Sequence, residues 1–338
     1  MSNIYVIAEK TGLSPSTVAR ALSGRGYCSQ KARQTVLEMA EKLHYTPTHA
    51  ARSLKSKRTE KVLMCVPDIY NPFYFKMIQG ANDVLEQYGY FILLCHTKHS
   101  VAQELKMIRS LTERYGDGMI LVSFDFNEKN LAAIRDCPLP IVLTNKYGGE
   151  KVMDNFDYVY VDDTKGIYLA TQHLIGQGHK KIALIVGSTA EQTGKERAEG
   201  FSAAMKDGGL PVPAGSVVQS DYTRKGGYGS AEKLLGGKDR PTAIVCANDL
   251  MAIGCMDSCR ARGIRIPGDV AVVSMDNTDF CTCTSPTLSS IDMQQEELGR
   301  IAATLLMERI DKKRRLKESV CLEPELVVRQ SSVTPQRR

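Results

Sequence analysis

The chain has 338 residues, of which 43% are hydrophobic and 24% charged, a balance typical of a folded globular protein with a large core. It contains neither a run of apolar residues long enough to span a membrane nor an N-terminal signal peptide, so we expect a cytoplasmic protein. The net charge is +6, yet residues 1–61 contain 11 Lys and Arg against four Asp and Glu, a local charge of +7. A basic head on a nearly neutral body indicates a polyanion bound by the head.

The head, residues 1–46, is predicted to form three short helices. Gly12 suits the left-handed turn after the first helix, and Ser14 followed by Pro15 is a typical start for the second helix. A third helix is predicted from Ser29. Inward-facing positions at helical spacing are Ile4, Ile7, Ala8, Val18, Leu22, Val36, Met39, Ala40 and Leu43.

This arrangement predicts a helix-turn-helix, in which the N-terminal part of the second helix contacts base edges in the major groove. An ordinary three-helix bundle with solvated charges is the alternative. The second helix leaves four residues on its outer face, and with the aromatic residue at the end of the head the DNA-binding candidates are Pro15, Ser16, Thr17, Arg20 and Tyr45.

Within the expected hinge, residues 47–61, the eight residues 49–56 are basic and carry one leucine, Leu54. Eight residues do not form a stable helix alone in water, because isolated helices shorter than about 12 residues are marginal. We therefore expect the segment to become ordered only when a partner holds it. Arg52 and Lys55 are positioned for phosphate contacts, so both join the DNA-binding candidates.

The body, residues 62–338, alternates apolar strands with amphipathic helices. Near-continuous apolar strands are typical of doubly wound parallel sheets and are expected to be buried on both faces. Two series of such strands predict two similar α/β subdomains. The expected strands are 62–66, 91–95, 119–122 and 141–143 in one series, 158–161, 182–186, 243–246 and 270–273 in the other, and 319–322 after a helix over 295–311.

Ligands of open α/β sheets lie at the carboxyl ends of the strands, so polar and aromatic residues just after strands are candidates for a binding site. Asp249 is interpreted instead as a cap of the helix that begins there. The candidates are Asn71, Phe73, Asp125, Asn145, the segment 188–197 with Arg197, Tyr222, Asn248 and Asp276.

An enzyme is not expected. The segment 187–196 resembles a phosphate-binding loop, but its glycines are wrongly spaced and no Ser or Thr follows Lys195. The ten cysteines are scattered, and none forms a C-x-x-C pair, so we interpret them as reduced thiols packed as small apolar residues. We predict no metal and no cofactor.

Seven stretches are distributed along the chain in this order: SPSTVARALSG at 14–24, YTP at 45–47, ARSL at 51–54, VPDIYNPF at 66–73, HLIGQGH at 173–179, RAEGF at 197–201 and ANDLMAIG at 247–254. Together they resemble the lactose-repressor/galactose-repressor (LacI/GalR) family of bacterial transcription regulators. The resemblance extends over nearly the whole chain.

The resemblance implies that residues 49–56 form a hinge helix on DNA, where Leu54 wedges into a base step. It implies that Arg197 and Asp276 bind polar atoms of a small effector, and one cation, one anion and aromatic rings suit a sugar or polyol. Val6, Ala19 and Ser23 depart from the family pattern in the head, and Ser274 with Met275 departs from it in the pocket.

The resemblance also implies interleaved subdomains of the periplasmic-binding-protein type. The expected organisation is a helix-turn-helix domain (1–46), a hinge (47–61), a first subdomain (about 62–160 and 290–322) and a second (about 161–289 and 323–330). The basic run 312–315 is interpreted as a solvated helix end.

The expected function is a repressor that binds a palindromic operator as a homodimer and responds to a small metabolite, most simply a sugar. The alternative is a sugar-binding protein of the same body fold without DNA regulation. The effector, and whether it induces or corepresses, stay open.

Overall fold

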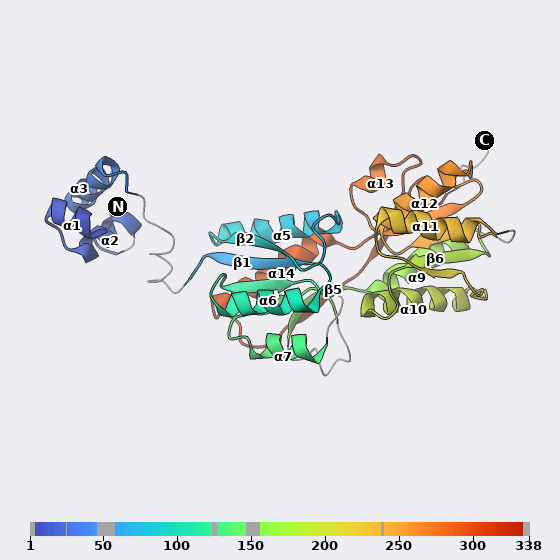
Figure 1. Ribbon diagram of the computed structural model, residues 1–338, viewed down its shortest axis with the longest axis horizontal. Coiled ribbons are helices and arrows are strands. Elements are labelled where there is room, and N and C mark those ends of the chain that lie inside the picture. Colours follow the sequence, from blue (N-terminus) through green and yellow to red (C-terminus); the bar gives the residue numbers. More distant parts are fainter. Residues whose placement is uncertain are drawn as a thin grey trace. The chain divides into compact units, whose positions relative to one another are not determined.

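The computed structural model describes residues 4–24, 26–45, 58–123, 127–146, 156–237 and 240–333. Contacts divide the chain into two compact units, Met1–Thr59 and Glu60–Arg338 (Figure 1). Most of the expected hinge, residues 46–57, lies outside the described residues.

The first unit contains α1 (Ile4–Thr11), α2 (Pro15–Ser23) and α3 (Gln30–Lys42). The hydroxyl of Ser14 accepts a hydrogen bond from the Thr17 amide at 3.2 Å, and Gly12 has a φ of 68° in the turn before it. Ile7, Val18 and Val36, one from each helix, are fully buried against one another. The three predicted helices, the starts of the second and third at Ser14 and Ser29, and the apolar core of the head are confirmed.

The second unit contains two six-stranded sheets. In the first, all neighbouring strands are parallel, and the order is β11-β5-β4-β3-β1-β2. Helices α5 (Phe73–Gln87) and α14 (Gln295–Ile310) cover one face, and α6 (Val101–Thr112) and α7 (Glu128–Asp136) cover the other (Figure 1). The strands are β1 (Lys61–Val66), β2 (Phe91–His96), β3 (Gly118–Leu121), β4 (Ile141–Leu143), β5 (Asp157–Val161) and β11 (Ser319–Leu322).

The second sheet has the order β12-β10-β9-β8-β6-β7 and is parallel except that β12 runs antiparallel to β10. Helices α9 (Asp163–Gly176) and α10 (Gln192–Asp207) pack together on one face, and α11 (Arg224–Leu235) and α12 (Asp249–Ala261) on the other (Figure 1). The short helix α13 (Phe280–Cys283) precedes β10. The strands are β6 (Ile182–Val186), β7 (Val217–Gln219), β8 (Ala243–Cys246), β9 (Ala271–Asp276), β10 (Ser289–Asp292) and β12 (Glu325–Val327).

The chain passes between the two sheets three times: after β5, after β10 and after β11. The interleaved connection expected for this fold is therefore present. The sequence predicted that the chain returns to the first subdomain at about residue 290. Because β10 pairs with β9 through Asp292, the chain leaves the second sheet only after Asp292. Strands β7, β10 and β12 lack a continuous apolar run, and the sequence did not predict them.

The expectation that all the apolar strands are buried on both faces is wrong for β2. This strand lies at the end of its sheet, and Phe91 and Leu94 are 63% and 48% exposed. Its neighbour β1, by contrast, is buried from Val62 to Val66. An edge strand has only one neighbouring strand and is covered less fully by the flanking helices.

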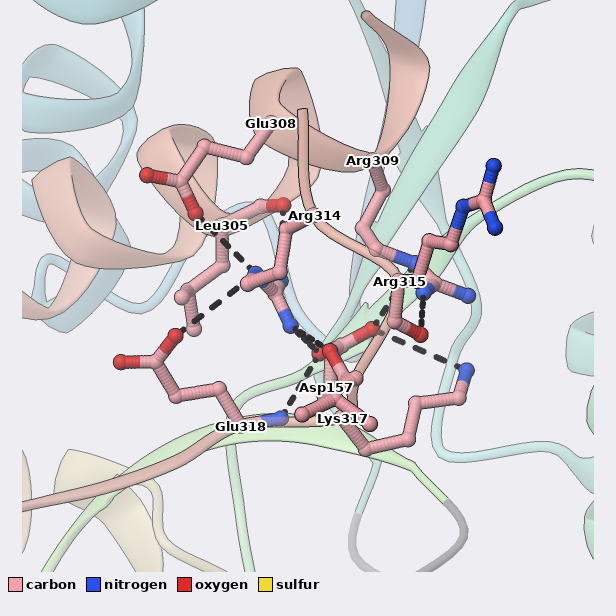
Figure 2. A network of polar contacts seen from close by, with 9 residues as sticks. Asp157, Leu305, Glu308, Arg309, Arg314, Arg315, Lys317 and Glu318 are labelled. Carbon is pink, nitrogen blue, oxygen red and sulfur yellow. Dashed lines mark hydrogen bonds and ion pairs between the residues drawn. The ribbon is translucent and has the colours of Figure 1, made fainter. Parts of the chain in front are cut away.

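The end of α14 is not merely solvated, as its basic run suggested. The side chain of Asp157, at the start of β5, is 1% exposed, and the Arg314 guanidinium binds it at 2.5 Å (Figure 2). Arg309 and Lys317 add nitrogens at 3.5 and 3.7 Å, and the Glu318 amide donates at 3.0 Å. The network holds the segment after α14 against β5. The interpretation of the basic run 312–315 as a solvated helix end is therefore wrong for Arg314.

Within the described ranges, no helix is long and apolar enough to cross a membrane. The ten cysteines are free thiols. Cys283 and Cys321 are exposed, so the expectation of apolar packing does not hold for these two.

Candidate functional site

A cleft of about 1000 Å³, part of it open to solvent, lies where the carboxyl ends of strands from both sheets meet. Residues at or after the ends of β1 to β5 line it from the first sheet, and residues at or after the ends of β7, β8, β9 and β10 line it from the second, together with α10. Among its polar residues are five carboxyl groups, Asp68, Asp163, Glu196, Asp221 and Asp276, and two cations, Lys146 and Arg197.

A buried ion pair lies at the wall of this cleft. Arg197 on α10 donates through Nε and Nη2 to Asp163 Oδ1 at 2.8 and 2.7 Å, and through Nη1 to the Ala247 carbonyl at 2.5 Å. Burial raises the pKa of Asp163, and the charge of Arg197 opposes this shift. Burial disfavours the charge of Arg197, but the Asp163 carboxylate holds its pKa above the usual value. Three donor groups of Arg197 are thus already directed at protein acceptors.

Asp276 ends β9 and is 4% exposed in the cleft. Burial raises the pKa of Asp276 well above its usual value, and the nearby charge of Asp249 raises it further. A carboxyl group in this state can exchange a hydrogen bond with a ligand hydroxyl as acceptor or, when protonated, as donor.

Asp249 does not cap α12, contrary to the sequence interpretation. The N-cap is Asn248, whose Oδ1 accepts from the Met251 amide at 2.8 Å. Asp249 is fully buried, and its carboxylate accepts hydrogen bonds from the hydroxyls of Ser274 (2.6 Å), Thr278 (2.7 Å) and Ser290. The serine at 274, noted as a departure from the family pattern, is therefore a partner of this buried acid.

Aromatic rings form the rest of the cleft wall: Phe73, Tyr74, Tyr160 and Tyr222. The ring of Tyr222 lies against the backbone of Gly187, where a Cβ would come within 2.0 Å of it. The Arg197 guanidinium lies 5.9 Å from the centre of the same ring. Tyr222 and Asp276 both have positive φ angles, 61° and 111°, in a region that side-chain-bearing residues rarely adopt and that is concentrated at functional sites.

Of the eight effector-site candidates chosen from the sequence, the cleft brings seven together, and Asp125 lies outside the described residues. Asn71 Oδ1 accepts from the Phe73 amide at 3.0 Å, and Asn145 Nδ2 donates to the Ser123 carbonyl at 3.0 Å, so both shape their own loops. The seven are Asn71, Phe73, Asn145, Arg197, Tyr222, Asn248 and Asp276.

Sequence reasoning missed several lining residues, although Asp68, Thr144 and Asp163 also follow strands and could have been chosen by the same rule. Thr144 is 2% exposed, and its hydroxyl has no hydrogen-bond partner among the described residues. A buried hydroxyl without a partner is costly, so its position in the cleft indicates a ligand or a water molecule.

On the head, Pro15, Ser16 and Arg20 are exposed on α2, and Thr17 is half-buried. Arg20 Nε donates to the Ser16 carbonyl at 3.3 Å, which extends its side chain along the helix surface. Tyr45 packs against the apolar core of the head. Arg52, Leu54 and Lys55 lie outside the described residues.

In the part of the chain that the structure describes, no group of three or more His, Cys, Asp or Glu side chains is arranged to hold a metal ion. The fold and the cleft define a class of protein: a ligand-binding α/β body joined to a helix-turn-helix head.

Comparisons with known proteins identify the family. Residues 3–48 match the model of the bacterial regulatory proteins of the lacI family, and residues 171–332 match a periplasmic binding protein-like domain. The HTH-type transcriptional repressor PurR of Photobacterium profundum is 31% identical over 332 residues, 98% of either chain. Catabolite control protein A of Priestia megaterium is 32% identical and covers 91% of this chain and 92% of its own. The chain belongs to the LacI family and is a DNA-binding transcriptional regulator.

Solved structures agree with this assignment. A complex of the transcriptional regulator CelR with cellobiose is 27% identical, with a TM-score of 0.75 over 98% of this chain and 100% of that one. The lac repressor dimer bound to operator and the anti-inducer ONPF is 21% identical, with a TM-score of 0.87 over 98% and 99%, a likeness of fold.

Proposed function

We propose that this regulator is a repressor whose operator affinity is controlled by an uncharged sugar or sugar derivative bound in the cleft. The observation that carries the proposal is the polar character of the cleft. Its five carboxyl groups outnumber its two cations, and Arg197 is already paired with Asp163. A phosphorylated or carboxylate effector would face repulsion here and would gain little from Arg197.

Uncharged hydroxyls fit the same groups well. Asp276 and Thr144 offer hydrogen-bonding atoms at the carboxyl ends of two strands, and Phe73 and Tyr222 offer apolar ring faces. Asn248 holds the Tyr222 carbonyl in place beside them at 2.9 Å. A pyranose or furanose ring has this combination, with hydroxyls around its rim and C–H groups on its faces. The CelR complex with cellobiose supports the same chemical class.

We further propose that the regulator acts as a homodimer in the bacterial cytoplasm, without catalytic activity. The head would read each half-site through Pro15, Ser16, Thr17 and Arg20. Tyr45 would support the head from its core, and Arg52, Leu54 and Lys55 would contact phosphates and the central base step. The alternative function is that of a sugar-binding protein without DNA regulation. It would not explain the helix-turn-helix head.

A thermal-shift screen tests the effector. Neutral mono- and disaccharides should raise the melting temperature of the full-length protein, whereas the corresponding sugar phosphates should not. Each hit is then added to an operator-binding titration, where a change of about 5- to 150-fold in affinity is expected.

Two variants test whether the sugar-induced rise in melting temperature comes from binding in the cleft. Asp276→Asn and Thr144→Val should reduce the sugar-induced shift while leaving ligand-free operator binding intact. Glu199→Gln, on the exposed surface of α10, is the matched control and should behave as wild type. A shift produced only by sugar phosphates would contradict the proposed effector class. A neutral-sugar shift that survives in both cleft variants would contradict the proposed site.

A further inference from the structure

Two cysteines lie side by side in the first sheet, outside the effector cleft. Cys65 on β1 and Cys95 on β2 are register partners in the parallel ladder, so their side chains point to the same face. Both are free thiols, and the Cys95 thiol donates to the Leu93 carbonyl at 3.5 Å. Neighbouring strands are about 4.8 Å apart. Disulfides join residues whose Cα atoms are about 4.4–6.8 Å apart, so the pair lies within reach of one.

The two thiols differ in their surroundings. Cys65 is fully buried, whereas Cys95 lies half-buried on the outermost strand of the sheet. The neighbouring Cys65 side chain lowers the pKa of Cys95, although burial opposes this effect. The same contact, burial, and the nearby charges of Cys95 and Glu104 raise the pKa of Cys65 well above its usual value. Cys95 is thus the more acidic and the more accessible of the two thiols, and Cys65 lies buried beside it.

Each cysteine lies a few residues before a loop that lines the cleft. Cys65 is three residues before Asp68, and Cys95 is four residues before His99; both Asp68 and His99 line the cleft. The two strand ends are tied together there, because the Thr97 amide donates to the Val66 carbonyl at 2.9 Å. A covalent bond between the two sulfurs would therefore act on both loops at once.

We propose that Cys65 and Cys95 form a peroxide-reactive dithiol site that reversibly modifies the regulator. The Cys95 thiolate attacks one oxygen of a hydroperoxide; an S–O bond forms, the O–O bond breaks, and the leaving oxygen takes a proton to become an alcohol or water. Cys65 then attacks the sulfenic sulfur of Cys95. An S–S bond forms, the S–O bond breaks, and the departing hydroxide takes the Cys65 proton as water. Two thiols lose two electrons, and one peroxide gains them.

The disulfide fixes the separation of the two strands at this level, because the Cβ atoms of a disulfide are held about 3.8 Å apart. It therefore ties together the strand ends that carry the Asp68 and His99 loops. Cys95 is half-buried on the outermost strand, so cellular thiols can reach the bond and reduce it, which makes the modification reversible.

The test treats the full-length protein with hydrogen peroxide, blocks free thiols by alkylation and maps the peptides by mass spectrometry. The expected result is a linked pair of peptides containing Cys65 and Cys95, which disappears on reduction. In Cys65→Ser, Cys95 should stop at the sulfenic acid and be trapped by dimedone. In Cys95→Ser, the buried Cys65 should stay a thiol.

Cys137→Ser is the matched control: Cys137 is a half-buried thiol near the Thr112 hydroxyl, at 3.9 Å, and its loss should leave the linkage unchanged. The exposed Cys283 reports ordinary thiol reactivity, and Cys95 should be oxidised about tenfold faster. Oxidation of Cys283 while Cys65 and Cys95 remain unlinked would overturn the proposal. So would a linkage of Cys65 to any other cysteine in wild type. If Cys65→Ser does not fold, Cys95→Ser alone tests the proposal, because Cys65 must remain reduced in that variant.

Discussion

At the scale of single residues, Arg20 is the side chain on which DNA sequence preference is expected to depend most. It is exposed near the end of α2, and an arginine on a recognition helix can donate two hydrogen bonds to guanine O6 and N7. Arg20→Ala should remove one G·C preference from each half-site, worth about 1–3 kcal/mol of discrimination. Selection from a randomised operator measures this. If the variant instead binds all sequences more weakly with an unchanged motif, Arg20 contacts a phosphate.

The ion pair in the cleft wall gives a second prediction for single residues. Asp163→Asn leaves the buried Arg197 without its counter-charge, which should lower the free energy of unfolding by about 3–5 kcal/mol. Lys195 and Glu199 form an exposed pair at 3.9 Å on α10, so Glu199→Gln should cost less than about 1 kcal/mol. Urea unfolding of the three proteins compares the two losses. Equal small losses would mean that Arg197 finds other partners.

At the scale of helices and strands, α5 and α14 approach each other so closely that only glycine fits at the crossing. A Cβ on Gly299 would lie 2.0 Å from the Met77 carbonyl, and one on Gly80 would lie 1.9 Å from the Glu296 carbonyl. Gly299→Ala should therefore destabilise the protein by about 1–3 kcal/mol, because the helices must separate.

Gly229 within α11 supplies the control for this crossing. A Cβ there would meet nothing within 4 Å. Gly229→Ala should stabilise the protein by up to about 1 kcal/mol, because alanine is the better helix former. Chemical denaturation gives both values. A stabilising Gly299→Ala would show that the crossing is looser than described.

Helices α11 and α12 are joined by a contact that depends on pH. Glu232 accepts hydrogen bonds from Arg262 at 2.6 and 2.7 Å and from Ser258 at 2.7 Å. These bonds, that of Arg262 first, lower the pKa of Glu232 to about 2. The unfolded value is about 4.3, so the folded state binds this proton more weakly. The stabilisation is therefore complete above about pH 4.3 and is lost as pH falls towards 2.

Glu232→Gln checks the sign of this dependence. The difference in urea midpoint between wild type and variant should be present near neutral pH and should shrink as pH falls to about 3. A difference that grows on acidification would contradict the contact.

At the scale of the whole molecule, positive charge is concentrated in the head, and the body is close to neutral. Operator affinity should therefore fall steeply with salt, because each phosphate contact releases a counterion. A homodimer should protect a two-fold symmetric site. Binding titrations from about 50 to 200 mM salt, with footprinting, measure both. Salt-insensitive binding or an asymmetric footprint would contradict the proposed dimer on its operator.

Local sequence determined much of this molecule. Ser14, Gly12 and Pro15 define the turn of the head through the conformations of their own backbone, and the apolar runs of β1 and β6 identify the buried strands. The rule that ligands lie after strands then selected Asn71, Arg197 and Asp276. These features depend on a residue and its near neighbours, or on a regularity of the fold class.

Only the tertiary structure decided the rest. Asp163 meets Arg197 across 34 residues, Asp249 meets Ser290 across 41, and Arg314 meets Asp157 across 157. The exposure of β2 depends on its place at the edge of a sheet. The short strands β7, β10 and β12 form because neighbouring strands offer them hydrogen bonds. Burial and pairing between distant segments have no local pattern, since their free energy arises only when the chain has folded.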